Sequence, residues 1–183
     1  MASRNDAIER ARRLRLMAFD IDGVMSDGSL FYSDAGIELK GFNTRDGLGI
    51  KLLQEAGIVT AIITGRRSPC VANRAADLGI THLFQGVGDK ATVLAGLLAE
   101  LGIDASQAGY MGDDIVDLKV MAICGFSAAP GDGHELAQRQ AALVTQQSGG
   151  RGAVREVCEF ILDAQGLLED ALAPWLPARQ TAN

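Results

Sequence analysis

The chain has 183 residues, of which 48% are hydrophobic and 22% charged, and its formal net charge is −6 at pH 7. This length predicts a single domain over residues 1–183, and the negative charge argues against nucleic-acid binding. No apolar run approaches the roughly 20 residues of a membrane span, and the N-terminus lacks the apolar stretch of a secretory signal. We therefore expect a cytoplasmic globular protein without a membrane or nucleic-acid partner.

Two groups of residues have an ordinary structural interpretation. The basic cluster near the N-terminus is expected on the solvated face of a helix that precedes the first strand; it comprises Arg10, Arg12, Arg13 and Arg15. The cysteines lie far apart and lack metal-ligand spacing, so we expect reduced packing residues at Cys70, Cys124 and Cys158.

The apolar segments alternate between strand-like and helix-like runs along the chain. The strand-like runs are residues 14–19, 58–64, 80–84, 108–111, 125–128 and 142–145. The helix-like runs are residues 46–56, 69–78, 90–101, 114–123 and 151–165. Alternating β and α units predict an α/β fold, a Rossmann-like parallel sheet with helices on both faces.

Capping residues set the expected helix boundaries. Asp46 is the expected N-cap of the first of these helices, and Gly57 follows its end. Ser68 precedes a proline in the first turn of the next helix, which Gly79 ends. Asp114 is the expected N-cap of the helix that follows the fourth strand.

Two segments depart from the alternation. Residues 29–42 contain two short extended runs around a turn, which predicts a projecting β-hairpin directly after the first strand. The tail, residues 167–183, contains Pro174 and Pro177 and is expected to be irregular and mobile at its end.

Polar residues follow the ends of several predicted strands. Asp20 and Asp22 come directly after the first strand, Thr64 ends the second, and Lys90 follows the third. The fourth strand leads into an acidic motif, Gly112-Asp113-Asp114 with Asp117. The carboxyl ends of parallel strands meet at one sheet edge, where α/β proteins bind their ligands. The sequence therefore predicts one site that contains all of these groups.

This set of groups suits magnesium-dependent phosphoryl transfer. A carboxylate nucleophile divides phosphate-ester hydrolysis into two steps through an aspartyl-phosphate, and Asp20 with Asp113 offers the oxygen ligands that Mg²⁺ prefers. Lys90 adds positive charge, and Thr64 with the backbone N–H of Gly65 is placed to hold phosphate oxygens. Asp22 is the candidate acid that protonates the leaving alcohol and then activates water.

The motifs resemble those of the haloacid dehalogenase-like phosphohydrolases: D-x-D-G, a strand-end Ser or Thr, a lysine, and G-D-D-x-x-D, in this order. The resemblance implies that Asp20 is the nucleophile, and that Asp22 is the acid/base and gives its backbone carbonyl to the metal. Asp114 and Asp117 would support the metal ligand Asp113. An aspartate at position 22 is typical of the phosphatases and mutases of this superfamily.

The spacing leaves no room for a cap domain between Asp22 and Thr64 or between Thr64 and Asp113. Within the superfamily the chain resembles the capless phosphatases of 3-deoxy-D-manno-octulosonate 8-phosphate, through residues 22–24, 43–47, 62–66, 78–83 and 149–157. This resemblance implies a homotetramer with packed hairpins, a role in lipopolysaccharide precursor synthesis, and a sugar-acid site at Arg66 and Arg74. If both arginines lie on one helical face, they reach one anion; alternatively, Arg66 lies on the surface and Arg74 pairs with Asp77 or Asp104.

Other functions remain open. The same fold acts on nine-carbon sialic-acid phosphates or as a general sugar phosphatase, and it also serves as a non-catalytic oligomerisation module. The intact Asp20, Asp22, Lys90 and Asp113 argue against the non-catalytic alternative. A phosphomutase would need a cap to exclude water, and the spacing leaves no room for one.

Overall fold

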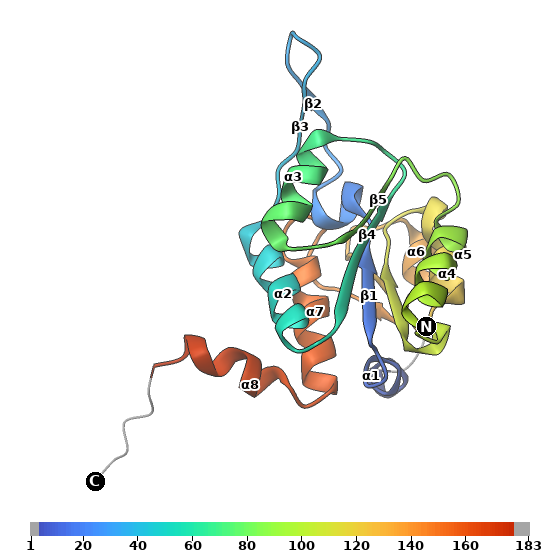
Figure 1. Ribbon diagram of the computed structural model, residues 1–183, viewed down its shortest axis with the longest axis vertical. Coiled ribbons are helices and arrows are strands. Elements are labelled where there is room, and N and C mark those ends of the chain that lie inside the picture. Colours follow the sequence, from blue (N-terminus) through green and yellow to red (C-terminus); the bar gives the residue numbers. More distant parts are fainter. Residues whose placement is uncertain (1–3, 178–183) are drawn as a thin grey trace.

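A computed structural model describes residues 4–177, and it contains a six-stranded parallel sheet with helices on both faces (Figure 1). The strand order β5-β4-β1-β6-β7-β8 places β1 between β4 and β6, which confirms the predicted Rossmann-like α/β fold. In chain order the strands are β1 (Leu16–Phe19), β4 (Val59–Thr64), β5 (His82–Gln85), β6 (Ala108–Met111), β7 (Phe126–Ala129) and β8 (Leu143–Val144).

Two apolar cores lie on opposite faces of this sheet, because alternate side chains of each strand point to opposite sides. Met17 and Phe19 of β1 belong to the first core, whereas Leu16 and Ala18 belong to the second core. The helices that cover the first core are α1 (Arg4–Ala11), α2 (Thr44–Glu55), α3 (Pro69–Leu78) and α7 (Ala153–Ala164). The helices that cover the second core are α4 (Lys90–Leu101), α5 (Leu118–Ile123) and α6 (Glu135–Gln140).

The strand register aligns the ends from which the predicted site residues emerge. Phe19 at the end of β1 lies beside Ile62 of β4 and Met111 of β6. The backbone N–H of Asp20 donates to the carbonyl of Met111 at 3.0 Å, so the parallel pairing continues one residue beyond β1. The first aspartate and the acidic motif therefore leave the sheet side by side.

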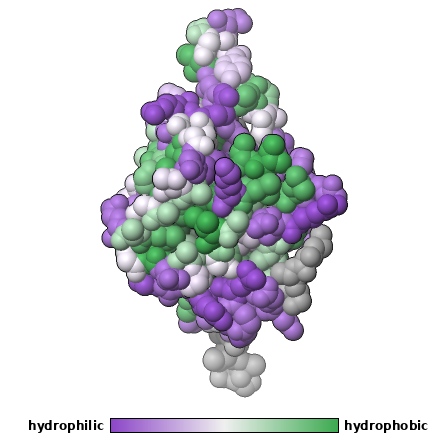
Figure 2. Space-filling model, turned by 90° about the vertical axis from the view of Figure 1, so that its right-hand side faces the viewer, coloured by the Kyte–Doolittle hydropathy of each residue, from purple (hydrophilic) through white to green (hydrophobic). Residues whose placement is uncertain are grey.

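The predicted hairpin is present and projects from the carboxyl edge of the sheet (Figure 1). Its strands are β2 (Phe31–Tyr32) and β3 (Glu38–Leu39), paired antiparallel, and the turn is closed by a hydrogen bond from Gly36 N to Ser33 O of 2.8 Å. Figure 2 shows apolar and polar side chains together on this projection. Its large apolar side chains are 41–61% exposed: Leu30, Phe31, Ile37 and Leu39.

The structure corrects the prediction for the tail. Residues 168–172 form the helix α8 (Leu168–Leu172), and a 3₁₀ turn follows at Ala173–Trp175. Leu168 and Leu172 pack against the apolar core beneath α7, and this contact orders the segment despite the nearby prolines. Residues 178–183 of the predicted tail lie outside the described residues.

Several element boundaries also differ from the prediction by a few residues, and two of these differences have a visible cause. The third strand begins at His82 rather than residue 80, because Ile80 donates its N–H to Ala75 O at 2.9 Å and closes the end of α3. The helix expected over residues 114–123 is divided into a 3₁₀ turn at Ile115–Asp117 and α5. Asp114 caps this turn as predicted, since its carboxylate accepts from the N–H of Ile115.

The predicted cap at Asp46 is wrong. Asn43 is the N-cap of α2, and its side chain accepts from the N–H of Arg45 at 2.9 Å. The buried carboxylate of Asp46 instead accepts from the N–H groups of Gly152 at 3.2 Å and Arg155 at 2.8 Å, at the start of α7. Asp46 thus joins two helices that lie far apart in sequence.

Within residues 4–177 no helix has the length and apolar character needed to cross a membrane.

Candidate active site

A cleft of about 380 Å³ lies at the carboxyl ends of β1, β4 and β6. It brings together most of the residues that the sequence singled out: Asp20, Asp22, Thr64, Gly65, Arg66, Lys90, Asp113 and Asp114. The remaining two do not line it. Asp117 is completely buried, and Arg74 lies outside the lining of the cleft.

Lys90 contacts two of the acidic groups at the bottom of the cleft. Its ammonium nitrogen lies 2.8 Å from Oδ2 of Asp20 and 2.6 Å from Oδ1 of Asp117. Lys90 is the first residue of α4, whose N-cap is Asp89, so the local start of the helix fixes where this lysine enters the site. All three interacting side chains are at most 8% exposed, which makes the ion pairs much less screened than those at a surface.

Asp117 is held by four hydrogen-bond donors. Its Oδ1 accepts from Lys90 and from the hydroxyl of Tyr110 at 3.0 Å, and its Oδ2 accepts from the N–H groups of Asp113 at 3.1 Å and Asp114 at 3.3 Å. These contacts leave Asp117 little capacity to bind anything else. Asp117 therefore holds Lys90 and the backbone of the acidic motif in position.

Sequence reasoning missed Tyr110, which is fully buried in β6. A signal was present, because a tyrosine within an apolar strand needs a partner for its hydroxyl when it is buried. The ring also lies beneath the ammonium of Lys90, 5.9 Å from its centroid.

The site is crowded with negative charge. Burial raises the pKa of Asp20 to about 6, and Lys90 offsets only part of this effect. Burial, together with the charges of Asp20 and Asp117, raises the pKa of Asp113 to about 7. Burial by itself would lower the pKa of Lys90, but the two carboxylates that it contacts outweigh burial and raise it. The site therefore favours the binding of an additional cation.

The same residues fit a divalent cation. Carboxylate oxygens of Asp20, Asp113 and Asp117 lie within 4.8 Å of one another, and Oδ1 of Asp20 is buried without a hydrogen-bond partner. Because Asp117 already accepts four hydrogen bonds, the carboxylates left to bind a cation are those of Asp20 and Asp113. Gly23 leaves the space that the side chain of Asp113 occupies: its φ is 85°, and a Cβ at this position would lie 2.1 Å from Oδ2 of Asp113.

Asp22 lies on the hairpin side of the cleft, between two cations. Lys40, directly after β3 of the hairpin, forms an ion pair with Oδ1 of Asp22, and Nε of Arg66 lies 3.8 Å from Oδ2. Arg66 also donates to Glu38 at 2.6 Å and to the hydroxyl of Tyr32 at 2.9 Å. Sequence reasoning identified the hairpin but not its charged contacts with the site.

The two predicted sugar-acid arginines occupy different environments. Arg66 precedes α3 and lines the cleft, whereas Arg74 lies within α3, donates to Asn43 O at 3.2 Å and stacks over Phe42 at 5.8 Å. The interpretation that both lie on one helical face is therefore wrong. Nε of Arg74 is buried without a hydrogen-bond partner, so this guanidinium retains an unused donor.

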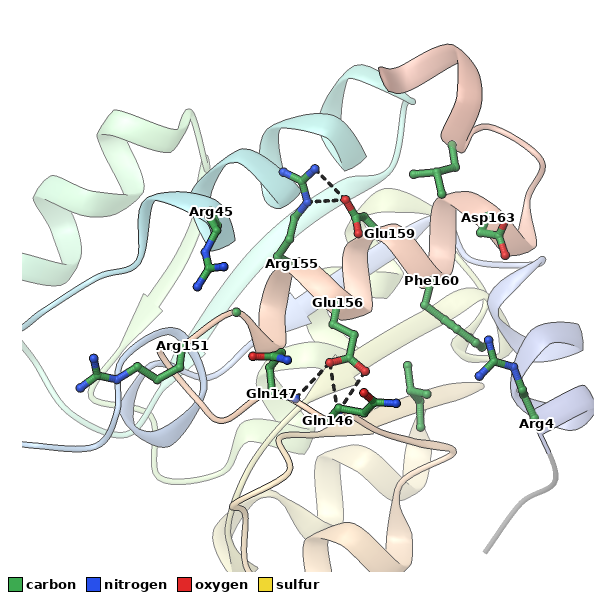
Figure 3. A pocket seen from close by; sticks show the side chains of 13 residues that line it. Arg4, Arg45, Gln146, Gln147, Arg151, Arg155, Glu156, Glu159, Phe160 and Asp163 are labelled. Carbon is green, nitrogen blue, oxygen red and sulfur yellow. Dashed lines mark hydrogen bonds and ion pairs between the residues drawn. The ribbon is translucent and has the colours of Figure 1, made fainter. Parts of the chain in front are cut away.

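A larger cavity of about 700 Å³ lies away from these residues, beside α7 and α8 (Figure 3). Two of its acidic groups already have partners: Glu159 pairs with Arg155, and Glu156 accepts from the backbone N–H groups of Gln146 and Gln147. Size alone therefore does not identify the site. The smaller cleft contains the convergent acids and Lys90.

Comparison with known proteins identifies the family. The chain is 51% identical to the 3-deoxy-D-manno-octulosonate 8-phosphate phosphatase KdsC of Yersinia pestis over 167 residues, which cover 91% of this chain and 89% of the relative. The chain belongs to the family of 3-deoxy-D-manno-octulosonate 8-phosphate phosphatases. It is therefore a phosphatase, and the family is a capless branch of the haloacid dehalogenase superfamily.

Solved structures of this family share the fold. The phosphatase of Moraxella catarrhalis, determined in complex with a magnesium ion, a phosphate ion and KDO, has a TM-score of 0.93 and is 43% identical; the match covers 95% of this chain and all (100%) of that chain. A hydrolase of the same superfamily, subfamily III A, from Legionella pneumophila has a TM-score of 0.90 and 39% identity, covering 93% of this chain and 94% of that chain. No protein-family model matches the chain.

Proposed function

We propose that the protein hydrolyses 3-deoxy-D-manno-octulosonate 8-phosphate to the free sugar acid and phosphate, with Mg²⁺ as cofactor and Asp20 as nucleophile. The observation that carries this proposal is the position of Asp20, whose carboxylate lies between Lys90 and the free carboxylate of Asp113 at the bottom of an open cleft. The family and the magnesium-bound Moraxella relative support the same chemistry.

In the first step the carboxylate of Asp20 forms a bond to phosphorus, and the bond between phosphorus and the ester oxygen breaks. Asp22 donates a proton to the leaving oxygen, so that the product departs as an alcohol. Thr64 and the backbone N–H of Gly65, which line the same cleft, are placed to hold phosphate oxygens while this occurs.

In the second step water attacks the aspartyl-phosphate. Asp22, now ionised, accepts a proton from this water, the bond between Asp20 and phosphorus breaks, and inorganic phosphate leaves. Lys90 stabilises the negative charge of the phosphoryl group in both steps, because its ammonium already lies beside the nucleophile.

Asp20, Asp113 and the backbone carbonyl of Asp22 would hold Mg²⁺, whose charge would reduce the repulsion between the carboxylates and the phosphate. The raised pKa values of Asp20 and Asp113 and the unpartnered oxygen of Asp20 support this assignment. Asp114 and Asp117 would keep Asp113 and Lys90 in place.

Arg66 and Arg74 are the proposed ligands of the substrate carboxylate. Arg66 lines the cleft, and Arg74 has an unused donor, as a site for a further anion requires. The proposed assembly is a homotetramer in which hairpins pack together, since the hairpin exposes apolar side chains that it cannot bury itself. We place the reaction in the cytoplasm, in lipopolysaccharide precursor synthesis.

A panel of phosphate esters tests this function. Phosphate release, with Mg²⁺ and with chelator, should be measured for 3-deoxy-D-manno-octulosonate 8-phosphate, a nine-carbon sialic-acid phosphate and hexose phosphates. We expect the highest kcat/KM for the eight-carbon substrate and no turnover in chelator. A preference for the nine-carbon or the hexose substrate would contradict the substrate assignment, and full activity in chelator would contradict the magnesium mechanism.

A further inference from the structure

Four charged side chains form a closed ring between the hairpin and the cleft. Lys40 pairs with Asp22 and lies 3.4 Å from Oε1 of Glu38; Glu38 pairs with Arg66 at 2.6 Å; and Nε of Arg66 lies 3.8 Å from Asp22. Positive and negative charges alternate around this ring. Two members belong to the cleft and two to the hairpin, so the ring connects the two parts.

Lys40 is the most deeply buried member of the ring. Its side chain is 0% exposed, whereas those of Glu38, Asp22 and Arg66 are 12%, 23% and 44% exposed. Burying a lysine ammonium is costly unless it is paired, and the ammonium of Lys40 forms ion pairs with both carboxylates of the ring. Such a lysine has few alternative positions, which makes it a rigid anchor for the more exposed carboxylate of Asp22.

Asp22 needs such an anchor to act as an acid. General acid catalysis requires the carboxyl group to lie within hydrogen-bond distance of the leaving oxygen, and small displacements reduce its efficiency. Two cations lie beside Asp22, and the proposed substrate carboxylate would engage Arg66. Lys40 is then the cation that remains to hold Asp22 in its position.

We propose that Lys40 is a positioning residue that orients Asp22 for proton transfer to the leaving group. This inference rests on the proposed function, in which Asp22 protonates the leaving oxygen. Lys40 does not line the cleft with the phosphate-binding groups, so its effect should pass through Asp22 and not through contact with phosphate.

Two substrates of matched shape separate positioning from folding. Phenyl phosphate and p-nitrophenyl phosphate both lack a carboxylate, but phenolate is the more basic leaving group and depends more on protonation. In Lys40→Met we expect kcat/KM to fall about 10-fold or more for phenyl phosphate and less than about 3-fold for p-nitrophenyl phosphate. Lys51→Met, at an exposed position of α2, is the matched control and should leave both values unchanged. An equal loss for both esters in Lys40→Met would overturn the inference.

A double-mutant cycle with Asp22→Asn identifies the route of the effect. If Lys40 acts through Asp22, Lys40→Met should change neither ester's kcat/KM by more than about twofold in the Asp22→Asn background. A further selective loss in that background would overturn the inference. The inhibition constant of inorganic phosphate should stay within about twofold of the wild-type value in Lys40→Met, since the phosphate site is intact.

Lys40→Gln covers the case in which Lys40→Met does not fold. It keeps a hydrogen-bond donor for Asp22, so we expect a smaller loss with the same selectivity for phenyl phosphate; a uniform loss would overturn the inference. Failure of the proposed function gives a different result. If Asp22→Asn affects both esters equally, then the role of Asp22 is wrong and the inference falls with it.

Discussion

The ammonium of Lys90 lies 2.8 Å from Oδ2 of Asp20, and both side chains are almost completely buried. This contact keeps one oxygen of the carboxylate occupied, while Oδ1 has no hydrogen-bond partner. The pair therefore presents a fixed carboxylate at the bottom of the cleft, with one oxygen that no other group of the described residues occupies.

Asp20→Asn should reduce phosphate release by about 10³-fold or more, because an amide attacks phosphorus poorly and is a weak ligand for Mg²⁺. The side chains have the same shape, so circular dichroism and the melting temperature should indicate an intact fold. Asp77→Asn makes the same change at an exposed position of α3 and should be fully active. Substantial activity of Asp20→Asn would contradict the nucleophile assignment.

Stability should depend on pH and on Mg²⁺ together. The pKa values of Asp20 and Asp113 are raised in the folded protein, from 3.8 to about 6 and about 7, so the folded state binds more protons than the unfolded state in this window. The free energy of unfolding contributed by these groups should therefore fall as pH rises from about 4 to about 7 in metal-free protein.

Mg²⁺ binding requires ionised carboxylates, so its affinity should rise through the same window and level off above it. Melting temperatures measured with and without Mg²⁺ should differ more at about pH 8 than at about pH 5. Asp113→Asn should lose most of this difference. Equal Mg²⁺-induced shifts at both pH values would show that the metal does not bind at Asp20 and Asp113.

Tyr110→Phe should lower both stability and turnover. Removal of the hydroxyl leaves Asp117 with one donor fewer in a fully buried site, which should cost about 1–3 kcal/mol in the free energy of unfolding. Because Asp117 also holds Lys90, kcat should fall several-fold. Urea denaturation and steady-state kinetics measure the two effects. Tyr32→Phe changes the other tyrosine of the chain, which is exposed, and should leave the free energy of unfolding within about 0.5 kcal/mol of the wild-type value.

Arg66→Ala should weaken the hydrolysis of sugar-acid phosphates more than that of p-nitrophenyl phosphate, since an arginine that binds a carboxylate has no partner when the substrate lacks one. The comparison is the ratio of kcat/KM values for the two substrates. Arg67→Ala, at the exposed neighbouring position, is the matched control. If Arg66→Ala reduces both activities equally, Arg66 acts on phosphate or on the hairpin rather than on the sugar acid.

The oligomeric state should depend on the hairpin. Phe31 and Leu39 lie opposite each other on β2 and β3 and are 58% and 54% exposed, so their replacement by serine should not disturb the protomer. In light scattering, the double variant should give smaller species than the wild-type protein, for which we propose a tetramer. Leu136→Ser changes an exposed apolar residue on α6 and should leave the size of the wild-type assembly unchanged. A monomeric wild-type protein with full activity would contradict the proposed assembly.

The sequence by itself determined the fold class and most of the residues that meet in the cleft. Strand and helix patterns alternate clearly. Asp20 and Asp113 follow apolar strands and Thr64 ends one, so a parallel sheet brings them to one edge. Local signals also placed the hairpin and the Asp114 cap, because turns and caps depend on residues close in sequence.

Only the tertiary structure decided the contacts between residues far apart in the chain. Asp46 looks like a local cap but binds the start of α7, and α8 forms because its leucines meet the core beneath that helix. Likewise, Lys40 resembles an ordinary hairpin lysine until folding buries it against Asp22. A local pattern encodes the nearest hydrogen bonds and apolar faces, whereas the partner of a buried charge is set by whichever distant segment packs against it.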